Sequence, residues 1–210
     1  LKHKSKLMGF SSDDKFSDVF RGAVWTSVAR VTAVLFGVIS SVIIARVYGA
    51  EMLGVVAIVN SFLLLVSAIA CMGTNTAILR LIPEQITKQS PSSAYGIYKK
   101  TLVLVLLASL LVGVIFYFSS GFIANKILSK PHMVFFVAIA SVFLVFKTLE
   151  RVNTSTIRGL FLIRTFAIMQ LLPQGINLLA LVFLTVLFSE PNIPIYTFLG
   201  GIVVTAFLGC

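Results

Sequence analysis

The chain has 210 residues, of which 58% are hydrophobic and 11% are charged, and its mean hydropathy is +1.04. This composition excludes a water-soluble globular domain, in which about a quarter of the residues carry a charge. The net charge of +10 does not indicate a nucleic-acid-binding protein, because the cations lie at the ends of apolar segments rather than on one basic face.

Six apolar stretches follow one another along the chain, each close to the length of a bilayer crossing. A helix rises about 1.5 Å per residue, so it needs about 20 apolar residues to cross a hydrocarbon core of about 30 Å. Transmembrane barrels are excluded because their strands alternate between apolar and polar residues, whereas the apolar stretches of this chain are continuous. We therefore predict an all-α, polytopic membrane protein. Its six transmembrane helices are predicted at Gly22–Arg46, Met52–Asn75, Thr101–Ile123, Met133–Asn153, Thr165–Phe188 and from Ile193 to the end.

Residues 1–21 carry charges and lack the apolar core of a signal peptide, so they predict a cytoplasmic N-terminal tail. Residues 22–210 form the predicted transmembrane lobe. Because the first residue is Leu1 and the last apolar stretch is unbroken at Cys210, we expect a fragment whose sixth helix is truncated.

The cations are distributed unequally between the two sides of these helices. If the N-terminus lies in the cytoplasm, twelve lie inside and three outside, as the positive-inside rule requires. We therefore predict a multi-pass protein of the cytoplasmic membrane with a cytoplasmic N-terminus. The inside set is Lys2, Lys4, Lys6, Lys15, Arg21, Arg80, Lys88, Lys99, Lys100, Arg151, Arg158 and Arg164, and the outside set is Arg46, Lys126 and Lys130.

The connections and small residues predict how the helices pack. The short outer turn at Gly49–Glu51 predicts that the first two helices form an antiparallel hairpin, and the longer connection after the second helix suits a segment lying along the headgroups. Close packing is predicted where small residues recur every four positions. The first helix carries the longest such run, and the second and third carry single pairs: Gly37-Ser41-Ala45, Ala57-Ser61 and Ser109-Gly113.

Arg30 lies about eight residues into the first predicted helix, roughly 12 Å at the helical rise. A charge at this depth indicates a cation that lines a polar cavity. The alternative is that the helix starts later and Arg30 extends to the inner headgroups.

The fourth helix has a cationic face. Its apolar part, Met133 to Phe146, is too short to cross alone, so the helix must continue through its charged end. Four polar residues then recur on one side, with Glu150 near enough to Lys147 to form a pair. Such a face suits phosphate groups. The alternative is ordinary positive-inside charge with a structural Lys147–Glu150 pair. The face consists of Lys147, Arg151, Thr154 and Arg158.

Three amides share a face of the fifth helix: Gln170, Gln174 and Asn177. Pro173 and Gly175 interrupt this face and predict a kink. The amides are candidates for hydrogen bonds to sugar hydroxyls, or alternatively they join neighbouring helices.

All these polar residues lie in the predicted cytoplasmic half, and Asn75 and Arg80 close the second helix at the same level. Together they predict a basic vestibule that opens to the cytoplasm. The central part of each predicted helix has no Asp or Glu, which favours anions over organic cations as the transported species.

The sequence predicts no catalytic residue, no metal site and no cofactor. Cys71 and Cys210 both fall in apolar helices, and His3 and His132 lie far apart in the sequence. Neither a disulfide framework nor a metal-ligand set is therefore expected.

Two segments carry a resemblance to a known family. Residues 45–54 read Ala-Arg-Val-Tyr-Gly-Ala-Glu-Met-Leu-Gly, and residues 73–83 read Gly-Thr-Asn-Thr-Ala-Ile-Leu-Arg-Leu-Ile-Pro. The chain resembles the N-terminal part of the polysaccharide flippases, the Wzx-type O-antigen and teichoic acid exporters. These belong to the multidrug, oligosaccharidyl-lipid and polysaccharide exporter superfamily.

The resemblance implies one lobe of a carrier that has twelve to fourteen helices in two lobes. Such a flippase moves a polyprenyl-diphosphate-linked oligosaccharide to the outer leaflet for the synthesis of cell-surface polysaccharide such as lipopolysaccharide. The implied partners are the lipid-linked oligosaccharide, membrane lipids, the C-terminal lobe of the same protein, and a glycan polymerase or other assembly proteins. Nucleic acid is not among them. The drug-export branch often has an acidic residue in its first helix, and none is present here.

Other functions remain open. One is an ion-coupled exporter of drugs or small metabolites, in which the basic face serves only topology. A second is a membrane enzyme of glycan assembly, although the chain shows neither a large outer loop nor an acid/base pair. A structural membrane scaffold is disfavoured by the cost of the polar residues inside the membrane.

Overall fold

The computed structural model describes residues 12–88, 91–127, 131–188 and 190–209, and the regular elements within these ranges are helices. The predicted all-α class is therefore confirmed. The helices are α1 (Ser12–Val47), α2 (Gly49–Cys71), α3 (Thr74–Lys88), α4 (Pro91–Phe118), α5 (Ser120–Phe122), α6 (Val134–Gly159), α7 (Ile163–Leu187) and α8 (Ile193–Leu208). A π-helical turn at Ile123–Ile127 and a 3-10 turn at Pro131–Met133 join α5 to α6.

Among the described residues, five helices are long and apolar enough to cross a membrane. Their crossing segments are Gly22–Val47, Gly49–Cys71, Tyr95–Phe118, Pro131–Gly159 and Ile163–Leu187. The apolar helix α8 has 16 residues, fewer than the roughly 20 of a full crossing. Large apolar side chains cover the outer surface, and Phe118 and Val186 are 82% and 81% exposed. Such a surface is stable in lipid rather than in water, so this is a multi-pass membrane protein.

Several helices extend beyond their predicted boundaries. Helix α1 begins at Ser12, inside the predicted tail, and α4 begins at Pro91, ten residues before the predicted start. Hydropathy reports only the part of a helix that lies in hydrocarbon, so polar helical ends escape it. Proline is well tolerated in a first helical turn, where its missing N–H leaves no hydrogen bond unmade.

The second predicted helix is divided in two. Met72 and Gly73 adopt left-handed backbone conformations, with φ of 44° and 74°, so α2 ends at Cys71 and α3 starts at Thr74. Helix α3 is amphipathic: Ile78 and Ile82 are buried while Arg80 is exposed. The connection predicted to lie along the headgroups is therefore itself helical, and it packs against α4 and α6.

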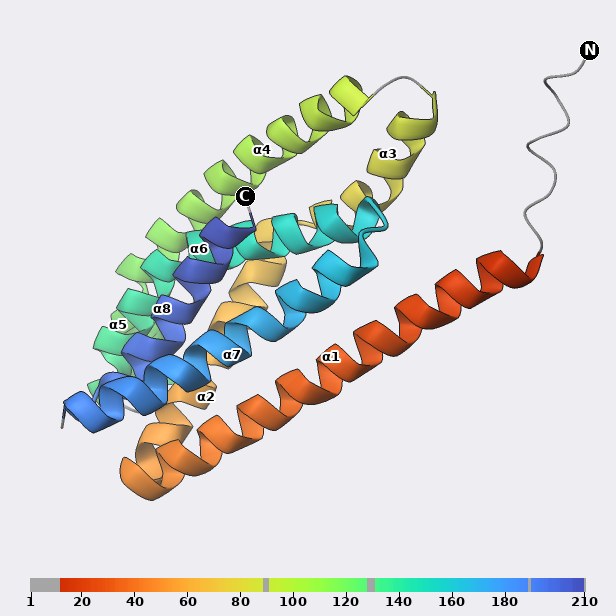
Figure 1. Ribbon diagram of the computed structural model, residues 1–210. Coiled ribbons are helices and arrows are strands. Elements are labelled where there is room, and N and C mark those ends of the chain that lie inside the picture. The colour runs from red at the N-terminus through yellow and green to blue at the C-terminus, as the bar shows by residue number, and fades with distance from the viewer. Residues whose placement is uncertain (1–11, 89–90, 128–130, 189, 210) are drawn as a thin grey trace, which may run out of the picture.

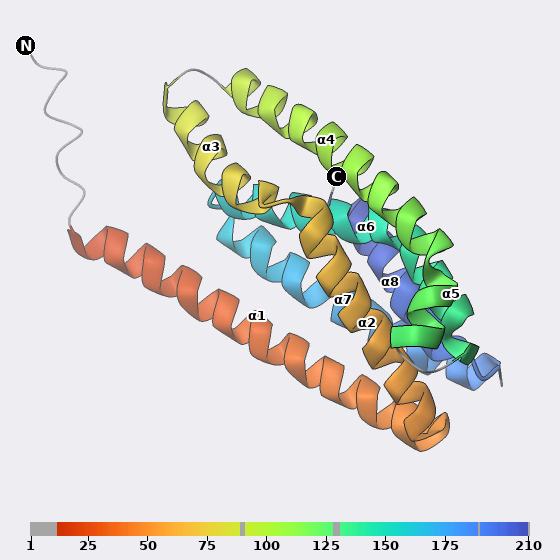
Figure 2. The same ribbon diagram turned by 180° about the vertical axis from the view of Figure 1, so that it is seen from behind.

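Helix α6 lies at the centre of the lobe, in contact with α2, α3, α4 and α8. Figures 1 and 2 show α1 and α4 on opposite sides of the bundle, with α6 and α8 between them. The main core joins α2, α6 and α8, and its fully buried members include Leu63, Leu144 and Leu199. The centre of the bundle is thus built from interdigitated aliphatic side chains.

The first two helices meet at their turn but do not form a closely packed hairpin along their length. Helix α1 makes most of its contacts with α7, and it diverges from α2 in both views (Figures 1 and 2). Near the turn, the hydroxyls of Tyr48 and Thr185 are hydrogen-bonded at 2.9 Å. The short turn correctly predicted that α1 and α2 are antiparallel, but it did not reveal that α7 lies along α1.

Small residues do mark close helix approaches, although the tightest is not in the longest run. A Cβ atom at Gly113 would lie 2.9 Å from the backbone oxygen of Ser141, so α4 and α6 are nearly in backbone contact there. At Gly37 the nearest atom would be Oε1 of Gln174, at 3.7 Å. Ala57 and Ser61 are both exposed, so this pair does not lie in a buried helix contact. The single pair Ser109-Gly113 thus marks the tightest of these three contacts.

Candidate substrate cavity

A cavity of about 610 Å³ opens at the end of the lobe where α1 begins. Its polar lining comes from α1, from the end of α6 and from α7. The turn between α6 and α7 closes one side, and Leu79 of α3 contributes to the wall. The polar residues lining it are Thr26, Ser27, Arg30, Arg158 and Gln170.

Helical periodicity explains why these side chains meet. On α1, Thr26 and Ser27 precede Arg30 by four and three positions, which places all three on one face. On α7, Phe166 and Gln170 are also four positions apart. Three residues predicted from different helices, Arg30, Arg158 and Gln170, are therefore brought together around one cavity.

The two arginines of the cavity lack carboxylate partners among the described residues. Both side chains are exposed. The guanidinium carbon of Arg158 lies 5.8 Å from the ring centroid of Phe166, a cation–π distance that orients the side chain without neutralising it. Both guanidinium groups are thus available to bind an anion.

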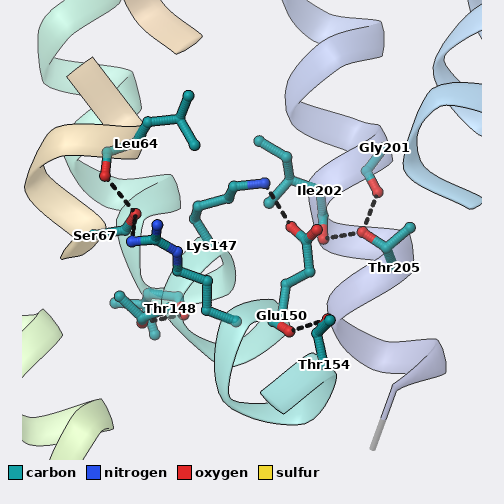
Figure 3. A network of polar contacts seen from close by, with 11 residues as sticks. Leu64, Ser67, Lys147, Thr148, Glu150, Thr154, Gly201, Ile202 and Thr205 are labelled. Atoms are coloured by element: carbon teal, nitrogen blue, oxygen red, sulfur yellow. Dashed lines mark hydrogen bonds and ion pairs between the residues drawn. The ribbon is translucent and has the colours of Figure 1, made fainter. Parts of the chain in front are cut away.

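The rest of the cationic face of α6 lies elsewhere. The ammonium of Lys147 donates to a carboxylate oxygen of Glu150 at 2.9 Å, and both side chains are only 15% exposed. Nη1 of Arg151 donates to the hydroxyl of Ser67 at 3.1 Å, and that hydroxyl donates to the backbone oxygen of Leu64. Figure 3 shows this cluster between α6, α2 and α8.

We call Lys147, Glu150, Arg151 and Ser67 the interior cluster. The Lys147–Glu150 pair predicted from sequence is confirmed. The four residues of the predicted phosphate-binding face do not share one surface. Lys147 and Arg151 point among the helices of the lobe, and Thr154 donates to the backbone oxygen of Glu150. Of the four, only Arg158 lines the cavity. Helix α6 turns its successive polar residues toward different neighbours because other helices surround it.

The three amides of α7 also separate. Gln170 lines the cavity, whereas Gln174 packs against α1 at Gly37. Asn177 packs against α8 at Gly201, and its side-chain oxygen is buried with no hydrogen-bond partner. Gln174 and Asn177 thus fit the alternative in which the amides join neighbouring helices. Gln170 fits the interpretation in which an amide is available to a substrate.

Asn75 and Arg80 lie on α3 rather than at the end of α2. Asn75 is partly buried and its side-chain oxygen lacks a partner, while Arg80 is exposed. Neither belongs to the cavity lining, to which α3 contributes Leu79. The break at Met72–Gly73 rotates this segment relative to α2, which hydropathy alone does not reveal.

Sequence analysis missed two groups of residues. Thr26 and Ser27 were detectable, because they precede Arg30 by one helical turn. The second group ties three helices together: Tyr98 of α4 donates to the side-chain oxygen of Asn153 at 2.8 Å, and Asn153 donates to the backbone oxygen of Ala206 at 3.2 Å. This contact had no local signal, because its members are more than fifty residues apart.

Comparison with known proteins gives one match. Residues 26–162 match the MatE family. Neither the curated proteins nor the solved structures contain a significant match to the chain. The matched segment runs from α1 to the turn after α6 and includes Arg30 and Arg158 of the cavity.

Proposed function

Because the chain belongs to the MatE family, whose match covers well over half of its length, we propose that it is one lobe of a membrane flippase. The family places the chain among the transporters of the multidrug, oligosaccharidyl-lipid and polysaccharide exporter superfamily. The proposed substrate is a polyprenyl-diphosphate-linked oligosaccharide. The observation that carries this proposal is the cavity lined by Arg30, Arg158 and Gln170, whose two arginines have no carboxylate partner among the described residues.

The chemistry of the cavity suits each part of such a substrate. Guanidinium groups bind phosphate oxygens through paired, charge-assisted hydrogen bonds, so Arg30 and Arg158 are assigned to the diphosphate. Gln170, Thr26 and Ser27 offer amide and hydroxyl groups to the sugar. The polyprenyl chain stays in the bilayer, because its transfer to water would be unfavourable.

Transport then requires no covalent step. In the proposed orientation the cavity faces the cytoplasm and receives the substrate from the inner leaflet. Rocking of this lobe against a second one exposes the bound head to the other side. The interior cluster has a different role, which is to hold α6 to α2 while the lobe moves as one body.

Ion-coupled export of organic cations is the alternative within the superfamily. A carrier of cations needs a carboxylate that faces its substrate, and no described residue that lines this cavity supplies one. Glu150, which lies within a crossing segment, is neutralised by Lys147. These two observations favour an anionic substrate.

The test is a translocation assay on the protein reconstituted in liposomes that contain a lipid-linked oligosaccharide. The native protein is expected to move the glycan across the bilayer, and the double variant Arg30→Glu and Arg158→Glu to lose at least about a hundredfold in rate, since each arginine contributes about 1.5–3 kcal/mol through charged hydrogen bonds. Arg46→Glu, an exposed cation at the other end of α1, is the matched control.

Two results contradict the proposal. One is the absence of glycan translocation together with proton- or sodium-dependent efflux of small cations. The other is unchanged translocation in the variant that carries both charge reversals.

A further inference from the structure

A second cavity, of about 410 Å³, adjoins the first at the turn between α6 and α7. The two share Gly22, Phe161, Leu162 and Ile163 as a common wall. The second cavity has lining residues that the first one lacks, chiefly Trp25 and Arg164. We call this second cavity, between α1 and the α6–α7 turn, the side mouth.

The side mouth lies at the level expected for lipid headgroups. The crossing segment of α7 begins at Ile163 and that of α6 ends at Gly159, so the turn between them marks a membrane boundary. Trp25 is the chain's one tryptophan and is 52% exposed. Tryptophan is enriched at this boundary because its ring is apolar and its N–H is polar.

The turn holds a large aromatic residue in an unfavourable backbone conformation. Phe161 has φ of 56°, and it donates to the oxygen of Arg158 while Leu162 donates to that of Ile157. This pattern is a Schellman cap, in which glycine usually takes the left-handed position. Phe161 is nevertheless 74% exposed, so no packing within the lobe accounts for its side chain.

Two cations lie near the aromatic residues Trp25 and Phe161 of the side mouth. Arg158 lines the first cavity, Arg164 lines the side mouth, and both are exposed. A phosphate at the turn would therefore meet guanidinium groups on both sides of the shared wall, with aromatic rings toward the lipid.

We propose that the side mouth is a binding site for a membrane lipid whose phosphate-bearing head is anionic overall, through which this head reaches Arg158 while its chain rests on Trp25 and Phe161. That this lipid is also the transported one rests on the proposed function. Binding itself does not, because it requires only the side mouth with Arg164 and the adjoining Arg158 of the first cavity.

The location of Trp25 supplies the test. The full chain is placed in bilayers that contain either phosphatidylglycerol or phosphatidylcholine brominated in the acyl chain near the headgroup, and the quenching of Trp25 fluorescence is measured. Half-maximal quenching is expected at an about tenfold lower mole fraction of the anionic lipid, the ratio given by one additional charge-assisted hydrogen bond. Equal quenching by the two lipids overturns the site.

Variants separate recognition from folding. The double change Arg158→Gln and Arg164→Gln is expected to abolish the preference, whereas Arg46→Gln keeps it. Phe161→Gly is expected to keep or raise the thermal stability, because glycine suits the left-handed position, and yet to weaken the preference. If Phe161→Gly lowers stability and leaves the preference intact, the aromatic contact is refuted.

Inorganic phosphate distinguishes a lipid from a free anion. It is not expected to displace the brominated lipid at millimolar concentration, because it lacks the chain. Full displacement would show that the arginines bind an anion alone and would overturn the part played by Trp25 and Phe161. Lipid preference without glycan translocation would leave the site intact and refute only the proposed function.

Discussion

The substrate cavity and the interior cluster contain the same kinds of side chain and use them in opposite ways. In the cavity, Arg30 and Arg158 are exposed and have no carboxylate partner among the described residues. In the interior cluster, Lys147 is only 15% exposed and is paired with Glu150, and Arg151 is hydrogen-bonded to Ser67. Charge inside a membrane lobe therefore does not by itself mark a binding site; the partner of each charge decides its role.

The largest effect is expected when the carboxylate of Glu150 is removed from the interior cluster. Glu150→Gln leaves the ammonium of Lys147 partly buried and unpaired, which is expected to lower the free energy of unfolding by about 3 kcal/mol. Lys147→Met combined with Glu150→Leu is expected to recover most of this loss, because no charge is then left alone. The free energy of unfolding of both variants is measured in mixed micelles that contain an increasing fraction of a denaturing detergent. Equal destabilisation by the single and double changes would show that the pair itself matters little.

Removing one arginine from each region gives a smaller effect. Arg151→Gln is expected to lower stability by about 2 kcal/mol through its lost bond to Ser67. Arg158→Gln is expected to change it by about 0.5 kcal/mol, the size of an exposed cation–π contact. The same unfolding assay compares the two variants. A larger loss for Arg158→Gln would reverse the roles assigned here.

Glycine substitutions test the same contrast through packing. Gly113→Ala is expected to cost about 1 kcal/mol, because the new methyl would press on the backbone oxygen of Ser141. A Cβ at Gly22, in the cavity wall, would instead meet the end of the Ile163 side chain, which is partly exposed and able to move. Gly22→Ala is therefore expected to stay within about 0.5 kcal/mol of the native protein. Thermal melting of both variants decides the order.

Much of the fold follows from the sequence alone. Uninterrupted apolar length identifies the crossing segments, and the spacing of Lys147 and Glu150 predicts their pair. Hydropathy fails at the polar ends of α1 and α4, and at the left-handed break before α3. That break contains Met72, a residue with no preference for such a conformation, so its position depends on tertiary packing.

The candidate site was predictable only in part. Arg30 and Gln170 stood out as polar residues within apolar helices, Arg158 was predicted as a member of the cationic face of the fourth helix, and all three line the cavity. Their separation from Lys147 and Gln174 was not predictable, because it depends on which helix packs against which face. A helical period gives the direction of a side chain relative to its own helix, but not the identity of the neighbour it meets.

The pairing of α1 with α7 has a consequence for biogenesis. Tyr48 and its partner Thr185 are 137 residues apart, so α1 enters the bilayer long before its main neighbour α7 is made. At a synthesis rate of about 5–20 residues per second, α1 waits roughly 7 to 30 s for α7. During that interval Arg30 and the α7-facing side of α1 are shielded only by lipid, water or the insertion machinery. Helix α1 thus acquires most of its contacts within the lobe only after α7 has been made.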